Sequence, residues 1–286
     1  MPVLFYALLS YFTWGVGTVY EAVAARRINS YSFTFWAALL SFTIFSILSP
    51  LFIKDLSHLT LTIFIISIIL GFFLHFGAIV YYEAIQRANP SIVGVIASSF
   101  PAVIVIISLV FLGERINIQQ LIAILIIFIG IILSSIDIKE IKKKNIKPER
   151  GIVFAVITMI SWGIYLGFIK VPVSKIGWFW PTYFAFMWFP IIFLYIKLRK
   201  IKLERPTTNK FLVPFIVSIT LVRIAELSYN FAVSRGLAAI IAPIAGASPT
   251  LYAPISLLVF KEKITWQQIV AIIITLIGIV LLGFLY

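Results

Sequence analysis

Residues 75–134 read HFGAIVYYEAIQRANPSIVGVIASSFPAVIVIISLVFLGERINIQQLIAILIIFIGIILS, and residues 223–282 are a second version of the same stretch. With a constant shift of 148 residues and no gap, 21 of the 60 aligned positions are identical. The shared residues that are not aliphatic place Tyr81 on Tyr229, Arg87 on Arg235, Pro101 on Pro249, Glu114 on Glu262 and Gly130 on Gly278. A repeat at constant spacing predicts two copies of one structural unit.

The composition indicates that the solvent of this protein is lipid. Hydrophobic residues make up 62% of the chain, charged residues only 12%, and the mean hydropathy is +1.11. A water-soluble domain of this length could not bury so much apolar surface, so we expect an integral membrane protein. The chain has no cysteine and two histidines. We therefore expect no disulfide, no metal site and no cofactor.

Ten apolar runs are long enough to cross a bilayer as helices, since the hydrocarbon core is about 30 Å thick. A β-barrel would need alternating polarity, which these isoleucine-rich runs lack. We expect an all-α membrane protein with spans at 3–24, 32–53, 60–86, 91–112, 118–136, 151–172, 179–197, 211–235, 239–260 and 266–285. The two repeats are then residues 1–136 and 151–286, joined by a basic linker at 137–150.

Each repeat holds five expected spans, and five is an odd number. The second repeat must therefore enter the membrane from the side opposite to the first. This predicts two inverted five-helix repeats around a central cavity, an arrangement that many secondary transporters share.

The net charge of +13 comes from basic residues in short loops between apolar runs. We expect these loops to contact anionic lipid headgroups, and we expect no nucleic-acid partner. The basic residues gather on one side of the expected membrane, in loops that include Arg26, Arg27, Lys142, Arg199 and Lys200. The positive-inside rule places this side in the cytoplasm of a cell (inner) membrane and both termini outside. The sequence leaves open whether the protein is a monomer or a homodimer.

Motifs repeated in both halves carry a family resemblance. They are Trp14-Gly15 with Trp162-Gly163, Pro101 with Pro249, Gly113-Glu114 with Lys261-Glu262, the glutamine pairs at 119–120 and 267–268, and Gly130 with Gly278. On these motifs the chain resembles the drug/metabolite transporter superfamily, specifically its ten-span EamA-like type. The resemblance implies export of a small metabolite by alternating access, with proton coupling or exchange. It also implies cytoplasmic termini, contrary to the charge count, and Lys261 departs from the usual glycine of its motif.

Charged residues near the middle of two expected spans are the main candidates for a binding site. Arg223 and His75 are repeat equivalents close to the bilayer midplane, where an arginine is costly unless it faces protein or water. Glu226 and Asn230 follow Arg223 on one helix face, and Tyr82 follows His75. Arg223 and Glu226 could form an ion pair that only makes each tolerable. Alternatively, they form a polar site on the central cavity.

In that second interpretation, Arg223 binds a carboxylate or phosphate, and Glu226 binds an amine or carries the coupling proton. One cation beside one anion suits a zwitterion, which favours amino acids or related compounds as the small-molecule substrate. His75 is a second candidate for proton coupling, although a histidine hydrogen-bonded between helices is an equal alternative.

Two tryptophans and two prolines lie in the middle of expected spans. Trp14 and Trp162 form either an aromatic wall for the substrate or packing beside Gly15 and Gly163. Pro101 and Pro249 each remove a backbone hydrogen bond and predict kinks at matching depth.

Three other functions stay open from the sequence: exchange of phosphorylated metabolites, transport of organic cations, and a membrane enzyme or lipid-handling subunit. No metal-ligand spacing, nucleophile–base constellation or phosphate-binding loop occurs in the sequence. We therefore expect a protein that is not an enzyme.

Overall fold

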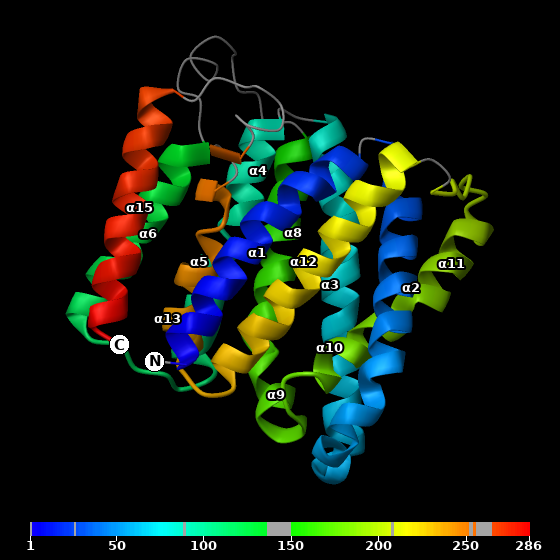
Figure 1. Ribbon diagram of the computed structural model, residues 1–286, viewed down its shortest axis with the longest axis horizontal. Coiled ribbons are helices and arrows are strands. Elements are labelled where there is room, and N and C mark those ends of the chain that lie inside the picture. The colour runs from blue at the N-terminus through cyan, green and yellow to red at the C-terminus, as the bar shows by residue number, and fades with distance from the viewer. Residues whose placement is uncertain are drawn as a thin grey trace.

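The computed structural model describes residues 2–25, 27–87, 90–135, 150–206, 209–251, 254–255 and 265–286, and the elements in these ranges are helices (Figure 1). The first half contains α1 (Pro2–Ala25), α2 (Ser30–Leu48), the 3₁₀ helix η1 (Ser49–His58), α3 (Leu61–Arg87), α4 (Pro90–Ser98), α5 (Phe100–Val110) and α6 (Ile118–Ser135). The second half contains α8 (Arg150–Phe168), α9 (Lys170–Ile176), α10 (Trp180–Ala185), the 3₁₀ helix η2 (Phe186–Trp188), α11 (Phe189–Leu198), α12 (Asn209–Val233), α13 (Ala238–Gly246) and α15 (Trp266–Phe284).

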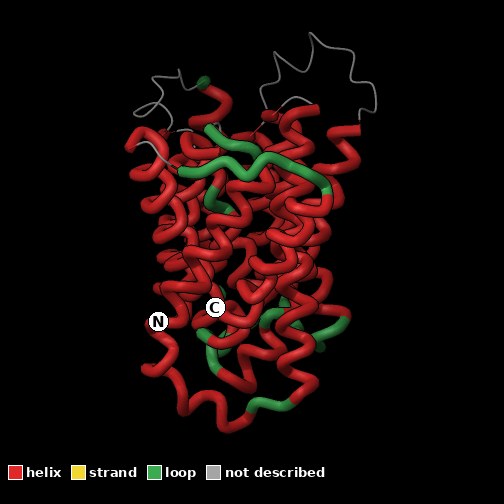
Figure 2. The backbone as a smooth tube through the Cα atoms, turned by 90° about the vertical axis from the view of Figure 1, so that its right-hand side faces the viewer, coloured by secondary structure: helices red, strands yellow, loops and turns green. Residues whose placement is uncertain are grey.

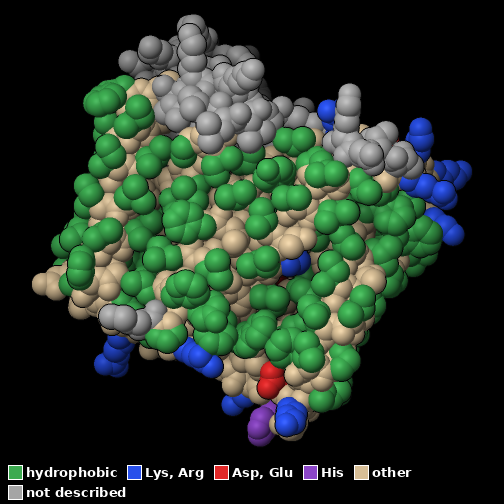
Figure 3. Space-filling view, viewed as in Figure 1, with side chains coloured by type: hydrophobic (Ala, Val, Ile, Leu, Met, Phe, Trp, Pro, Cys, Tyr) green, Lys and Arg blue, Asp and Glu red, His purple; other side chains and the backbone are tan. Residues whose placement is uncertain are grey.

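The lengths and surfaces of these helices are those of a multi-pass membrane protein. In the described part of the chain, seven helical segments are long and apolar enough to cross a membrane. The outer faces of these helices are apolar. On α15, for example, the side chains of Ile273 and Val280 are 50% and 55% exposed. Figure 3 shows the same apolar surface over most of one face of the molecule. Figure 2 shows the helices running side by side, with most loops at the two ends of the bundle.

Three shorter apolar helices lie at Ile96–Val110, Ile118–Leu133 and Ala238–Leu251. They occupy positions where we expected the fourth, fifth and ninth spans. The all-helical membrane fold expected from the sequence is present in the described residues, whereas the count of ten spans stays a prediction.

The two halves of the chain interlock, because the main helix pairs each join one helix from either half. These pairs are α1 with α12, α3 with α8, and α6 with α15 (Figure 1). Glycines allow the close approach of α6 and α15, since a Cβ added at Gly278 would lie 2.8 Å from Cγ1 of Ile127. Gly77 of α3 lies in the same way against Trp162 of α8.

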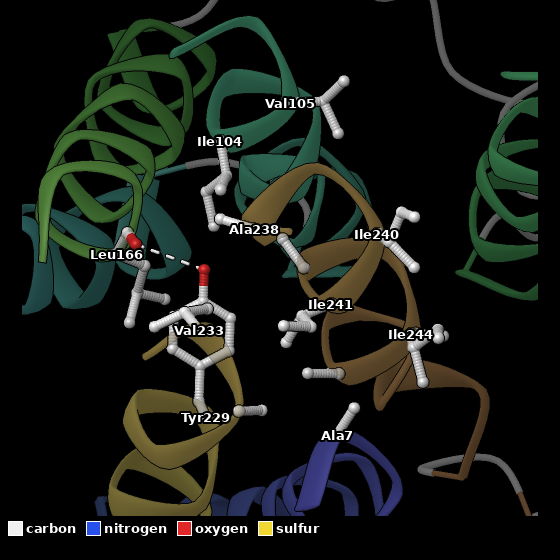
Figure 4. Packing of buried hydrophobic residues seen from close by; sticks show 14 of the residues in the cluster. Ala7, Ile104, Val105, Leu166, Tyr229, Val233, Ala238, Ile240, Ile241 and Ile244 are labelled. Atoms are coloured by element: carbon white, nitrogen blue, oxygen red, sulfur yellow. Dashed lines mark hydrogen bonds between the residues drawn. The ribbon is translucent and has the colours of Figure 1, made fainter. Parts of the chain in front are cut away.

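The buried core lies where α1, α5, α8, α12 and α13 meet (Figure 4). Its side chains come from both halves, with Ala7 and Ile104 from the first and Leu166 and Ile241 from the second. Tyr229 is 1% exposed in this core, and its hydroxyl donates to the carbonyl of Leu166 at 3.2 Å. Lipid offers no hydrogen-bond acceptor to a tyrosine hydroxyl, and here a backbone carbonyl of α8 accepts instead.

The helices break near both mid-span prolines. The expected span 91–112 is divided at Ser99, where φ is −79° and ψ is 4°, and Pro101 lies in the first turn of α5. The equivalent break falls at Ala247, with φ −71° and ψ −2°, two residues before Pro249. Because proline has no N–H to donate to the preceding turn, a helix that meets one is interrupted there.

A further break divides the expected span 179–197. Helix α10 ends at Ala185, the three residues of η2 follow, and α11 begins at Phe189 with Pro190 in its first turn. From the sequence we expected no break within this span, although the span itself is present as the candidate membrane segment Trp180–Leu198. Pro190 cannot donate to the carbonyl of Phe186, which accepts instead from the N–H of Phe189.

A buried carboxylate fastens the end of α5 to the start of α13. The two oxygens of Glu114 accept from the backbone N–H groups of Ala238 and Ala239 at 2.9 and 2.8 Å. The ammonium group of Lys170 lies 2.5 Å from Glu114 and also donates to the carbonyl of Gly236 at 2.7 Å. Glu114 thus satisfies N–H groups at a helix start that has no side-chain cap of its own. Glu262, its repeat equivalent, lies outside the described residues.

We predict that Glu114→Ala lowers the free energy of unfolding by about 2–4 kcal/mol, because it leaves a partly buried lysine and two buried backbone donors without their acceptor. Thermal unfolding of the purified protein in detergent measures this change. The control is Glu83→Ala, which removes an exposed pair with Arg87 and should cost less than about 1 kcal/mol. Equal losses in the two variants would contradict the bridging role of Glu114.

Candidate functional site

Arg223 occupies the middle of the membrane-spanning part of α12, with Glu226 one turn further on. Nη1 of Arg223 lies 2.5 Å from Oε2 of Glu226, and their side chains are 15% and 3% exposed. An unpaired charge at this depth would be costly, and the pair reduces that cost. Figure 3 shows a basic side chain at mid-height of the apolar face, beside a hollow, while the other basic side chains in view lie near the two ends.

Two neighbouring elements complete the surroundings of this pair. The hydroxyl of Tyr165, on α8, donates to the second oxygen of Glu226. Phe186, in the break between α10 and α11, lies under the guanidinium, whose central carbon is 4.5 Å from the ring centroid. Nε of Arg223 is buried, and no described residue accepts from it. Arg223 is therefore held on one side and keeps a free donor.

His75 reaches the same break from α3. Its Nε2 lies 3.1 Å from the carbonyl oxygen of Ala185, and its ring meets Phe186 edge-on at 5.6 Å. His75 and Arg223, which are repeat equivalents, thus lie on the same phenylalanine. The carbonyl of Ala185 makes His75 a donor through Nε2.

Asn230 has a different role from the one that its spacing suggested. Its Nδ2 donates to Oγ1 of Thr182 at 2.7 Å and to the carbonyl of Trp178 at 3.1 Å. These bonds fasten α12 to the start of α10, and Asn230 is fully buried. Its Oδ1 has no partner among the described residues. The structure therefore places Asn230 against α10 and not beside the Arg223 guanidinium.

Tyr82 contacts a carboxylate that is not among the candidate site residues from the sequence. The hydroxyl of Tyr82 donates to Oε1 of Glu21, on α1, at 2.8 Å. Arg223 also acts electrostatically on Glu21. The available signal was the helical spacing of Glu21, which lies seven residues after Trp14 and so shares its face of α1.

The mid-span tryptophans form a separate aromatic cluster around Phe100. Trp14 and Trp162 each lie 6.3 Å from the Phe100 ring and meet it edge-on. Trp14 also packs against Tyr229 at 5.8 Å, and Trp162 against Tyr81 at 5.3 Å. Each tryptophan thus contacts a tyrosine from the other half of the chain. The indoles act at least as packing residues between the halves.

Metal-binding and covalent chemistry have no visible centre in the described ranges. No group of three or more His, Cys, Asp or Glu side chains lies close enough to hold a metal ion there. Around the ion pair of Arg223 and Glu226 the structure brings together Tyr165 and, against the same Phe186, His75. Such a set binds charged groups and includes no activated nucleophile.

Comparison with known proteins gives the family. The model of the EamA-like transporter family matches this chain twice, over residues 1–136 and 149–284. An uncharacterized protein of Methanocaldococcus jannaschii is 29% identical over 140 residues, which are 47% of this chain and 97% of that protein. A solved crystal structure superposes with a TM-score of 0.79 over 98% of this chain and 94% of its own, at 16% identity, which concerns the fold alone. The family match confirms the resemblance that the repeated motifs indicated: the chain belongs to the EamA-like transporter family.

Proposed function

We propose that this protein is a secondary transporter that exports small zwitterionic metabolites, amino acids or related compounds, by alternating access with proton coupling or exchange. Membership of a transporter family supports transport of small molecules. The cargo class is argued from the pair formed by Arg223 and Glu226. Export and its coupling are what the family resemblance implies.

The observation that carries the proposal is the incomplete pairing of Arg223. One nitrogen of its guanidinium faces Glu226, while the buried Nε has no described partner and the side chain keeps 15% exposure. A substrate carboxylate that accepted from Nε and a terminal nitrogen would make the two parallel bonds that suit this group.

Charge balance favours a zwitterion over the other cargoes. Arg223 and Glu226 together are neutral, and so is a zwitterion whose carboxylate meets Arg223 and whose amine meets Glu226. A phosphorylated metabolite would add negative charge, and an organic cation would add positive charge, to a poorly solvated site. Because both oxygens of Glu226 already accept hydrogen bonds, an ammonium group would replace or share existing donors there.

We further propose ten spans arranged as two inverted repeats, residues 1–136 and 151–286, with the linker 137–150 between them. Contacts related by the 148-residue shift support this arrangement. Trp14 packs on Tyr229 as Trp162 packs on Tyr81. In the same way, α1 pairs with α12 as α8 pairs with α3. Such a pairing would give one gate at each end from a single design.

Glycine contacts and a shorter relative support the same arrangement. Gly15 lies against Leu251, and the equivalent Gly163 lies against Val103. The 140 matched residues make up 97% of the relative from Methanocaldococcus jannaschii, and this is about the length of one proposed repeat. A repeat is therefore a unit of a size that exists as a separate chain.

We predict that Arg223→Ala lowers kcat/KM for amino acid transport by about 10- to 100-fold, because charge-assisted bonds contribute about 1.5–3 kcal/mol. Uptake of a radiolabelled metabolite panel into proteoliposomes, with and without a pH gradient, measures this loss. The control is Arg235→Ala, which removes an exposed arginine that is also stacked on a phenylalanine, Phe231.

The panel should include the matching deaminated acid and decarboxylated amine of each amino acid. We expect both to compete poorly, because each leaves one charge of the site unmatched. Equal transport by the wild-type and Arg223→Ala proteins would rule out the zwitterion assignment. A chemically altered product would indicate a membrane enzyme instead.

Orientation follows from the basic end of the bundle. Asn29 donates to the carbonyl of Lys202, so the loop holding Arg27 lies beside the loop after α11, which is rich in lysine and arginine. Both termini lie toward the other end (Figure 1). We propose that the basic end faces the cytoplasm of the cell (inner) membrane.

Because the chain has no cysteine, an introduced cysteine is its only thiol. We predict that His58→Cys reacts with a membrane-impermeant maleimide in intact cells, whereas Lys200→Cys reacts only after permeabilisation. The opposite labelling pattern would place both termini inside the cell, as the family resemblance implies.

A further inference from the structure

Two carboxylates share one arginine among the membrane-spanning helices. Glu226 forms an ion pair with Arg223, and its second oxygen accepts from Tyr165. Glu21 accepts from Tyr82, and no lysine or arginine of the described chain lies within ion-pair distance of it. One cation can neutralise only one of these two carboxylates.

No ion pair of the described chain compensates a negative charge on Glu21, and the side chains around its partner Tyr82 are apolar. Its partner Tyr82 is 7% exposed and lies in a cluster with buried Phe33, Phe211 and Phe215. The ring of Phe33 meets the ring of Tyr82 edge-on at 5.7 Å, and it also meets the ring of Phe215 edge-on at 5.4 Å. An ionised carboxylate beside such a cluster is costly unless water reaches it, whereas the protonated form is not.

We propose that Glu21 carries the coupling proton of this transporter and that Tyr82 positions it, a role that rests on the transport function proposed above. The groups that face Glu21 from neighbouring elements are the Tyr82 hydroxyl on α3 and, at longer range, the Arg223 charge on α12. Helix α2 contributes the apolar ring of Phe33.

This assignment separates the proton from the cargo. The ion pair with Arg223 favours the charged form of Glu226, which is the form that a substrate amine would meet. The Nε2 of His75 is already engaged by the carbonyl of Ala185. Glu21 takes a proton from water on one side of the membrane as its O–H bond forms. It returns the proton to water on the other side as that bond breaks.

The coupling test uses proteoliposomes with an acidic interior. The wild-type protein should exchange external labelled amino acid against internal unlabelled amino acid, and it should also accumulate label in response to the pH gradient. Glu21→Gln keeps the acceptor for Tyr82 and should retain exchange, while gradient-driven accumulation is lost. Accumulation by Glu21→Gln equal to that of the wild type would overturn the proposal.

A measurement that needs no substrate tests the proton site independently of the proposed cargo. Infrared spectra recorded across a pH titration should show a protonated-carboxyl band that Glu21→Gln removes and Glu226→Gln retains. Loss of the band in Glu226→Gln alone would assign the proton to Glu226 and overturn the inference. If amino acids are not exchanged but the band belongs to Glu21, the cargo assignment fails and the proton site stands.

Two further variants exclude a purely structural effect. Tyr82→Phe keeps the ring against Phe33 but removes the hydrogen bond to Glu21, so it should shift the pH profile of transport while exchange continues. Glu83→Gln changes the next residue of α3, which pairs with Arg87 at an exposed position. It should leave both the pH profile and accumulation unchanged, and a shift equal to that of Tyr82→Phe would contradict the positioning role.

Discussion

An arginine in the middle of a membrane-spanning helix is the constraint on which the surrounding structure depends. In hydrocarbon its charge must meet protein or water, and Arg223 meets a carboxylate on its own helix and an aromatic ring from another. The hydroxyl of Tyr165 then donates a hydrogen bond to the second oxygen of that carboxylate. The helical break at Phe186 is part of the same solution, because it brings a ring face under the guanidinium and turns the Ala185 carbonyl toward His75.

The packing contacts between the helices recur in the two halves, whereas the charged pair in the middle of the membrane does not. Contacts of Trp14 and Trp162, of Gly15 and Gly163, and of the paired long helices recur under the 148-residue shift. The charged pair in the middle of α12 does not recur: Arg223 corresponds to His75, and Glu226 to Ala78. A scaffold with two similar halves can offer two gates of nearly equal energy, while a single charged pair would give the proposed cargo one site. Alternating access needs both properties, since the same site must face each side in turn.

The repeat, the apolar runs and the breaks near Pro101 and Pro249 could be predicted from the sequence, because each depends on composition or local backbone chemistry. The pairing of Arg223 with Glu226 could also be predicted, since residues three apart on a helix are neighbours.

Contacts between different helices could not be predicted from the sequence. Tyr165 lies 61 residues from Glu226, and Tyr82 lies 61 residues from Glu21. Spacing along one helix placed Asn230 with Arg223, but its amide bonds to α10 instead. The break at Phe186 was missed because Pro190 follows it by four residues inside an otherwise continuous apolar run.

Placing proton and cargo on different carboxylates requires a physical link between them, and the packing of α1 on α12 supplies one. Gly17 of α1 lies so close to α12 that an added Cβ would be 3.1 Å from Cβ of Leu221 and 3.0 Å from Cγ2 of Val222. Glu21 lies one turn beyond Gly17 on α1, and Arg223 directly follows Val222 on α12. Two helices in such contact cannot slide freely past each other, because packed interfaces resist continuous deformation. In the proposed transport cycle, a displacement of α12 that turned Arg223 toward one side of the membrane would carry Glu21 with it. Proton and cargo would then change sides through one movement without competing for the same oxygen atoms.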